Sequence, residues 1–423
     1  MQAIKNKYGK ILAYIVAILY VSDIPFFFLP FSVRTRFFLG LLGIFIFFTY
    51  YVRNRCLDKR VWNNILWLLA LLLPFLLTTI VNSNLDSWGF RAVLNVLVLF
   101  AAFLVIHLFK KTDIEAIFRI IINVVLINII LAYLMFFFSP MKDFVFRLQG
   151  LKVDLGAQEY YTSTYRLYGI GNFFFYQAGV FCSWILILIT YFLKKKVTLH
   201  MVFTYFFVLI SGIFFARTTF IGFVISALYY LFPNAGTVQV FRQSFLKAIF
   251  LVFTLLILFS LSQNMFRTFL LDNKDDKMFA HAFEFFLSFY EDGKFETDST
   301  NHLSEMYIYP EYLRTWLIGD GKFVADGGVG YYMGTDVGYL RVLFFMGLFG
   351  LFVMYLQKIF LLYSTFKLKK IDQYSYKLLI YFLFGLTLIL NLKGFTDLDM
   401  LVFLFFWQLL LNKEVVYNEN INR

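Results

Sequence analysis

Charged residues, cysteine and proline are all scarce in this 423-residue chain. Only 15% of its residues are charged, and it has two cysteines and six prolines. Soluble domains carry about 25% charged and about 45–50% apolar residues, whereas 61% of this chain is hydrophobic and 22% is aromatic. A water-soluble globule cannot bury so much apolar surface. The composition therefore excludes a cytosolic enzyme, a disordered chain and a nucleic-acid-binding scaffold, and so few cysteines argue against a disulfide framework.

Long apolar runs dominate what remains, and phenylalanine alone occupies 59 positions. A membrane-spanning helix needs about 20 mostly apolar residues, and this length predicts an all-α polytopic membrane protein with about twelve spans. The stretch 197–233 is too long for one crossing, so we divide it at Arg217. The expected spans are 11–30, 37–52, 62–81, 91–109, 114–138, 169–193, 197–214, 217–233, 248–263, 337–358, 377–392 and 399–412.

Lysine and arginine gather in every second loop between these spans. With the N-terminus inside, the inner segments hold clusters such as Lys194–Lys196 and the group from Lys358 to Lys377, whereas the outer loop 82–89 holds none. The positive-inside rule then places both termini in the cytoplasm. The net charge of +12 is thereby explained by topology, and no nucleic-acid partner is expected.

Two outer segments are too long for plain connections, namely 139–168 and 264–336. The second contains nearly half of the 26 acidic residues of the chain, and its aromatic residues recur at helical spacing over 278–289. It is expected to form a small cap of amphipathic helices, one of them beginning with Asp298 as its N-cap. The expected organisation is spans one to nine over 1–263, the cap over 264–336, and the last three spans with a cytoplasmic tail over 337–423.

Charged side chains at membrane depth are costly and are therefore candidates for function. Arg217 lies between two expected spans and is followed by two threonines, and its guanidinium offers a rigid fork of donors that suits phosphate. The alternative is an arginine that only reaches lipid headgroups. Arg166 stands where the outer loop enters the sixth span, near tyrosines that could stack on sugars. Those tyrosines could equally form an interfacial aromatic belt.

A third group lies where the chain re-enters the membrane after the large loop. Asp336 and Arg341 flank this point, but five positions do not place two residues on quite the same helix face, so their direct pairing is left open. Asp336 could simply stabilise the helix N-terminus. Arg341 is harder to dismiss, because it lies about one turn inside the apolar layer. Arg91, at the outer end of the fourth span, is a weaker candidate for the same anion site.

The large loop also carries groups able to accept a proton. His302 and Glu305 are three positions apart, so they would share one face of a helix. A histidine or a carboxylate is what a glycosyl transfer needs to deprotonate an attacking sugar hydroxyl. The alternative for each is an ordinary solvated surface residue. The same reasoning covers His281, Glu311 and Arg314.

Neither a metal nor a nucleotide cofactor is expected. The sequence has no closely spaced pair of histidines or cysteines of the kind that binds metal and no Walker A or Rossmann glycine pattern. The first outer loop, around 31–36, is basic, whereas lipid-linked sugar transferases often have an acidic pair there.

Together these motifs resemble the O-antigen and capsule repeat-unit polymerases (the Wzy-type family) and their relatives, the O-antigen ligases. The resemblance rests on Arg217-Thr218-Thr219, on the large outer loop, and on the stretch from Trp316 to Gly350. Ligases tend to have serine before the arginine, where this chain has Ala216, and a His-Asn-like pair where it has Thr335-Asp336. Both departures favour the polymerase.

This resemblance implies a GT-C-type fold in the bacterial inner membrane, with the active site facing the periplasm. It implies transfer of a growing glycan from undecaprenyl diphosphate to a new lipid-linked repeat unit, without nucleotide or metal, and a chain-length regulator as a further partner. Arginines would hold the leaving diphosphate, and His302, Glu305 or Asp336 would act as the base. The diphosphate group comprises Arg166, Arg217, Arg314 and Arg341, and the sugar-contacting group comprises Tyr165, Tyr168, Trp316 and Tyr339.

Two other functions stay open at this point. An O-antigen ligase shares the donor but uses a lipid A-core acceptor. A lipid-linked oligosaccharide flippase or another transporter also suits about twelve spans, although transporters do not normally carry a folded outer loop of this size, and the two halves lack matching broken spans. The sugar, the linkage and the choice between inversion and retention are not determined.

Overall fold

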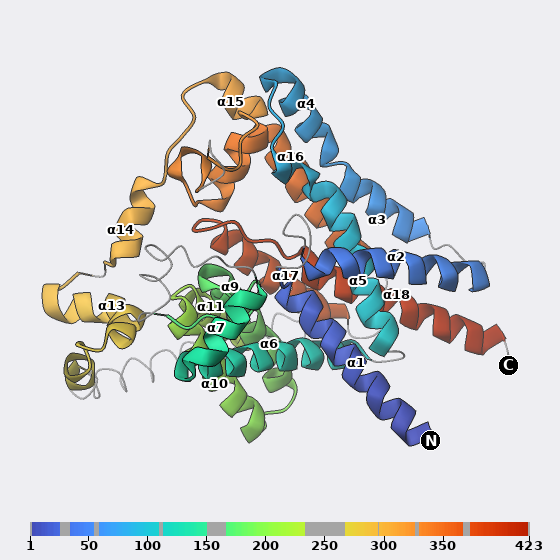
Figure 1. The fold of residues 1–423 in the computed structure, drawn as a ribbon, viewed down its shortest axis with the longest axis horizontal. Coiled ribbons are helices and arrows are strands. Elements are labelled where there is room, and N and C mark those ends of the chain that lie inside the picture. Colours follow the sequence, from blue (N-terminus) through green and yellow to red (C-terminus); the bar gives the residue numbers. More distant parts are fainter. Residues whose placement is uncertain are drawn as a thin grey trace. The chain divides into compact units, whose positions relative to one another are not determined.

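The computed structural model describes residues 2–25, 34–54, 59–109, 113–149, 166–232, 267–294, 296–325, 330–366 and 373–421 (Figure 1). Most residues in these ranges are helical, and the ranges contain no named strand, only two isolated bridges. Five helices in them are long and apolar enough to cross a membrane. An all-α membrane protein is thereby confirmed, while the number of twelve spans and the GT-C-type fold stay predictions. The expected span 248–263 lies outside the described residues, and helix overlaps each of the other expected spans.

The chain divides into two compact units. The first unit comprises Met1–Val124, Glu305–Ile371 and Thr387–Arg423, and the second comprises Val125–Ser304 and Asp372–Leu386. The large outer segment 264–336 is therefore shared between the units. Three helices also cross the division, namely α6 (Ile114–Phe137), α14 (Asp298–Glu305) and α17 (Gln373–Leu390).

Helix α5 (Arg91–Phe109) is the centre of the first unit. Nearly all of its residues from Leu97 to Ile106 are buried, and it packs against α1 (Gln2–Ser22), α2 (Thr35–Asn54), α3 (Lys59–Leu69) and α18 (Asp399–Ile421). The crossing with α2 is close, because a Cβ at Gly43 would lie 2.1 Å from the Phe100 carbonyl oxygen. Small residues allow such an approach between membrane helices.

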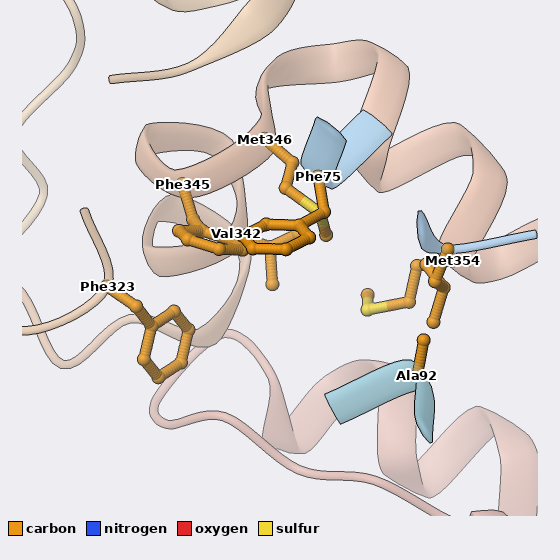
Figure 2. Close-up of a cluster of buried hydrophobic side chains, with 8 residues drawn as sticks. Phe75, Ala92, Phe323, Val342, Phe345, Met346 and Met354 are labelled. Carbon is orange, nitrogen blue, oxygen red and sulfur yellow. The ribbon is translucent and has the colours of Figure 1, made fainter. Parts of the chain in front are cut away.

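The remaining elements of the first unit surround a break in a long helix. Helix α16 (Gly338–Phe366) changes direction at Gly347, which has a φ of 65° and a ψ of −170°. Both halves of α16 contribute to one apolar cluster, in which Phe75, Val342 and Phe345 meet and Met354 faces Ala92 (Figure 2). The other elements are α4 (Leu72–Asn82), η2 (Ser87–Phe90), α15 (Leu313–Ile318) and η3 (Tyr332–Gly334).

The second unit is built on α9 (Phe175–Lys195), which packs against α10 (Leu199–Phe215) and α11 (Thr219–Leu231). Besides its parts of α6, α14 and α17, the described residues of this unit include α7 (Ser139–Leu148) and α13 (Lys277–Asp292). The aromatic spacing over 278–289 falls on α13, so an amphipathic helix forms there as expected. The N-cap expected at Asp298 is instead Thr297, whose hydroxyl accepts a hydrogen bond from the Thr300 amide at 3.1 Å.

Candidate functional site

The break at Gly347 shapes the candidate site of the first unit. A break in a helix leaves backbone carbonyls without their usual partners. Here the amides of Asp320 and Gly321 donate to the carbonyl oxygens of Phe344 and Phe345, at 2.6 and 3.1 Å. The segment after α15 thus closes the first half of α16, and this short half-helix carries Arg341.

The Arg341 guanidinium is held between two aromatic rings. Its central carbon lies 4.0 Å from the ring centres of both Phe323 and Tyr331, and its side chain is only 12% exposed. Both rings are within the distance at which a guanidinium is attracted to an aromatic face. Its Nε is buried, and within the described part of the chain it has no hydrogen-bond acceptor. The rings therefore hold the Arg341 guanidinium in place, while part of its hydrogen-bonding capacity is unused among the described residues.

Asp336 is the acid beside this arginine. Its Oδ1 lies 3.7 Å from Nη1 of Arg341, and the Tyr331 hydroxyl donates a hydrogen bond to it. Burial raises the pKa of Asp336 to about 6, an effect opposed by the positive charges of Arg341 and Lys393. The pairing that the sequence left open is present, because Asp336 precedes the helix and its side chain is not bound to the helical spacing.

A second charged cluster lies deeper in the first unit, around Lys358. Its Nζ lies 2.6 Å from Oδ1 of Asp397 and 3.1 Å from Oδ1 of Asp399. Arg91 pairs with Asp397 at 3.0 Å, and the Asn95 amide donates to Asp399 at 3.3 Å. Two cations thus balance two carboxylates. The side chain of Lys358 is only 5% exposed, so counting it among the cytoplasmic loop charges is wrong.

Aromatic rings connect the two clusters. Phe323, which covers Arg341, stacks on Trp88 with ring centres 4.2 Å apart and an interplanar angle of 16°. The Arg91 guanidinium lies 5.5 Å from the Trp88 ring and 4.9 Å from that of Phe395. Arg91 is therefore tied to Asp397 on one side and to the aromatic wall of the Arg341 site on the other.

The second unit has its own arginine site, at the turn between α10 and α11. Arg217 donates through Nη1 to Glu284 and through Nη2 to the Ser299 hydroxyl at 2.7 Å. On the other side, Nε of Arg166 donates to Nε2 of His281 at 2.8 Å. His281 Nδ1 lies 3.8 Å from the same Glu284 oxygen that Arg217 contacts. The two arginines that the sequence suggested independently thus belong to one network.

This geometry assigns a tautomer to His281. Arginine is only a donor, so Nε2 of a neutral His281 accepts and its proton is placed on Nδ1, on the side of Glu284. α13 supplies both His281 and Glu284, one turn apart, and α14 supplies Ser299. The arrangement can hold an anion on two guanidinium groups and can accept a proton on a carboxylate.

The other candidates from the sequence occupy different surroundings. His302, Glu305, Glu311 and Arg314 are exposed. Trp316 is half-buried, with its indole donating to the Pro310 carbonyl and its ring stacked on Tyr309. Tyr339 donates to the Leu388 carbonyl.

Two of the tyrosines expected to contact sugars need separate mention. Tyr165 lies outside the described residues. Tyr168 is 3% exposed and packs among Met135, Val145 and Phe146, so its ring faces are covered by protein. A ring covered in this way offers no stacking face to a sugar.

Sequence reasoning missed Glu284, Asp397 and Asp399 altogether. Glu284 is three positions after His281, which is a helical spacing and could have suggested a pair. Asp397 and Asp399 flank the start of α18 and would have stood out as acids beside an apolar run. Within the described ranges, no group of three or more histidines, cysteines and acids is arranged to hold a metal ion.

Comparison of this chain with protein-family models, with curated proteins and with solved structures finds no match.

Proposed function

We propose that the protein is a glycosyltransferase that polymerises undecaprenyl-diphosphate-linked repeat units into O-antigen or capsular polysaccharide on the periplasmic face of the inner membrane. The observation that carries this proposal is the Asp336–Arg341 pair. It sets a carboxylate whose pKa is raised to about 6 beside a buried, aromatic-stacked arginine at the start of an apolar helix. A proton acceptor next to an anion binder is what glycosyl transfer from a lipid diphosphate requires.

In the proposed step, a hydroxyl of the acceptor sugar attacks the anomeric carbon of the donor glycan. The new carbon–oxygen bond forms as the bond to the diphosphate breaks, and the bonding electron pair leaves with the diphosphate. Asp336 takes the hydroxyl proton. Arg341 stabilises the charge that develops on the leaving oxygen, since a preorganised donor in a dry site costs little reorganisation.

The Arg166–Arg217 network supplies the second anion site of the proposal. A diphosphate there would replace the Glu284 carboxylate on Arg217 and bring phosphate oxygens against two guanidinium groups. Trp316 and Tyr339 stay candidates for sugar contact. Both termini are proposed to be cytoplasmic, and the partners are the two lipid-linked glycans and a chain-length regulator.

A gene deletion with complementation tests the proposal. Deletion is expected to reduce the surface glycan ladder to a single-repeat band, and the wild-type gene to restore it. The Asp336→Asn and Arg341→Ala variants should fail to restore it at normal membrane level. A normal ladder from both variants would refute the assigned roles. Polymer stranded on the carrier lipid would indicate a ligase instead, and loss of all surface repeats a flippase.

A further inference from the structure

Helix α15 presents an apolar face to its surroundings. Leu313 is 73% exposed, Leu317 is 50% exposed and Tyr312, just before the helix, is 72% exposed. Leu313 and Leu317 are four positions apart, so they lie on one side of the helix. Glu311 and Arg314 are exposed as well. Large apolar side chains grouped on a surface indicate that something covers them.

Helix α4, next to α15, also has a row of exposed apolar side chains. Its exposed apolar residues recur every three or four positions, which makes one continuous stripe. α3 and α4 together form one of the five stretches able to span a membrane, and two-thirds of its most apolar window is not buried by protein. The stripe therefore faces lipid. It consists of Leu73, Leu76, Leu77, Ile80 and Val81.

Hydrogen bonds fasten α15 to the end of this stripe. The Thr78 hydroxyl donates to the Ile318 carbonyl at 2.6 Å, and the Asn82 amide donates to the Gly319 carbonyl at 3.0 Å. Both donors belong to the last turns of α4, and α15 lies beside that end of the helix (Figure 1). The exposed face of α15 thus continues the apolar stripe of a helix that is long and apolar enough to cross a membrane.

We propose that α15 is an interfacial helix that rests in the outer surface of the bilayer. Tyr312, Leu313 and Leu317 contact lipid, while Glu311 and Arg314 reach headgroups and water. An apolar face with charged and tyrosine residues at its edge is the usual composition of such a helix. This part of the large loop then belongs to the membrane surface and not to a water-exposed cap. The inference goes beyond the proposed reaction, because it does not depend on what the protein transfers.

The experiment uses the full chain in lipid nanodiscs, where a water-soluble maleimide reaches both faces of the bilayer. Cys56 and Cys182 are first replaced by alanine, and single cysteines are then introduced as Leu313→Cys, Leu317→Cys, Glu311→Cys and Arg314→Cys. Glu311→Cys is the control, because Glu311 precedes the helix and is exposed. Arg314 is three positions before Leu317, so Arg314→Cys tests the edge of the apolar face. A fluorophore attached at each position, with nitroxide-labelled lipid as quencher, provides the second measurement.

Cysteines at 313 and 317 are expected to react at least about tenfold more slowly than the cysteine at 311, because a thiol in apolar surroundings has a raised pKa and less reactive thiolate. The cysteine at 314 is expected to react at an intermediate rate. Fluorophores at 313 and 317 should be quenched by the nitroxide lipid more strongly than the fluorophore at 311. Equal reaction rates at all four positions would overturn the proposal. Slow reaction at 313 and 317 without lipid quenching would also overturn it, because protein rather than lipid would then cover the helix.

Discussion

Asp336 and Arg341 lie 3.7 Å apart at their nearest charged atoms, although five positions separate them. Five residues of α-helix turn through about 500°, which would point the two side chains well away from each other. The pair forms because α16 begins at Gly338. Asp336 lies in the loop before the helix, so its side chain can approach Arg341 in the first turn. The ion pair is thus a product of where the helix begins.

The pH dependence of activity should follow the ionisation of Asp336. Its pKa is raised from 3.8 to about 6 chiefly by burial, and only the carboxylate can accept a proton. We expect polymer formation from purified lipid-linked repeat units to rise with pH through about 6, and Asp336→Asn to be inactive at every pH. A wild-type rate that is flat between pH 5 and 7 would contradict the assigned role.

The raised pKa of Asp336 should make the folded protein less stable as pH rises, whereas it should make the enzyme more active. Between about pH 4 and 6 the folded protein keeps a proton on Asp336 that the unfolded chain has released, so this group makes the folded state less stable as pH rises. Thermal unfolding in detergent should show this decline. The Asp336→Asn variant should lose it, since an asparagine does not titrate in this range.

The Arg217–Glu284 contact can be tested with two substitutions that should move KM in opposite directions. A hydrogen bond to a charged group contributes about 1.5–3 kcal/mol, so Arg217→Ala should raise the KM for a lipid-linked substrate by about tenfold or more. Glu284→Gln removes the carboxylate that competes for Arg217 and should lower KM. Ser299→Ala is the control, because it removes only a neutral contact of Arg217. Movement of KM in the same direction in both charged variants would contradict competition between Glu284 and the diphosphate.

The Lys358 cluster predicts a stability effect that a second substitution corrects. Among the described residues, Lys358→Met leaves Asp397 and Asp399 with Arg91 as their one paired cation, and breaking a buried ion pair costs about 3–5 kcal/mol. Adding Asp399→Asn restores the balance between Arg91 and Asp397, so the double variant should regain much of the loss. Unfolding temperatures in detergent for both single variants and the double variant measure this coupling. Simple additivity of the two losses would show that the charges do not interact.

The break in α16 should tolerate no side chain at Gly347. Its positive φ costs about 1–3 kcal/mol for other residues, and a Cβ there would lie 2.3 Å from the Leu317 carbonyl. Gly347→Ala is expected to lower the unfolding temperature and to abolish polymer formation, because the half-helix that carries Arg341 loses its place. Gly385→Ala in α17 is the control. A Cβ there meets nothing within 4 Å, so this change should stabilise the helix by about 0.5–1 kcal/mol.

Much of the secondary structure could be predicted from the sequence, because it depends on local composition. Apolar runs of the length of a bilayer became α5, α6 and α9, and the aromatic spacing after Lys277 became α13. Arg166, Arg217, Asp336 and Arg341 could be selected because a charge beside an apolar run is costly wherever the chain places it. The assignment of Lys358 to a loop was wrong, because a lysine near the end of an apolar segment looks like a loop residue. Its carboxylate partners, Asp397 and Asp399, lie far away in the sequence.

Local composition is sufficient to identify an all-α membrane protein and the arginines at the edges of its apolar segments. The partners of those arginines depend on how the helices pack. Glu284 is 67 positions from Arg217, and Asp397 is 306 positions from Arg91. Local sequence carries no information on which distant carboxylate meets a given guanidinium, because helix packing sets those distances. Hydropathy places a segment in the membrane, and packing places its charges beside one another.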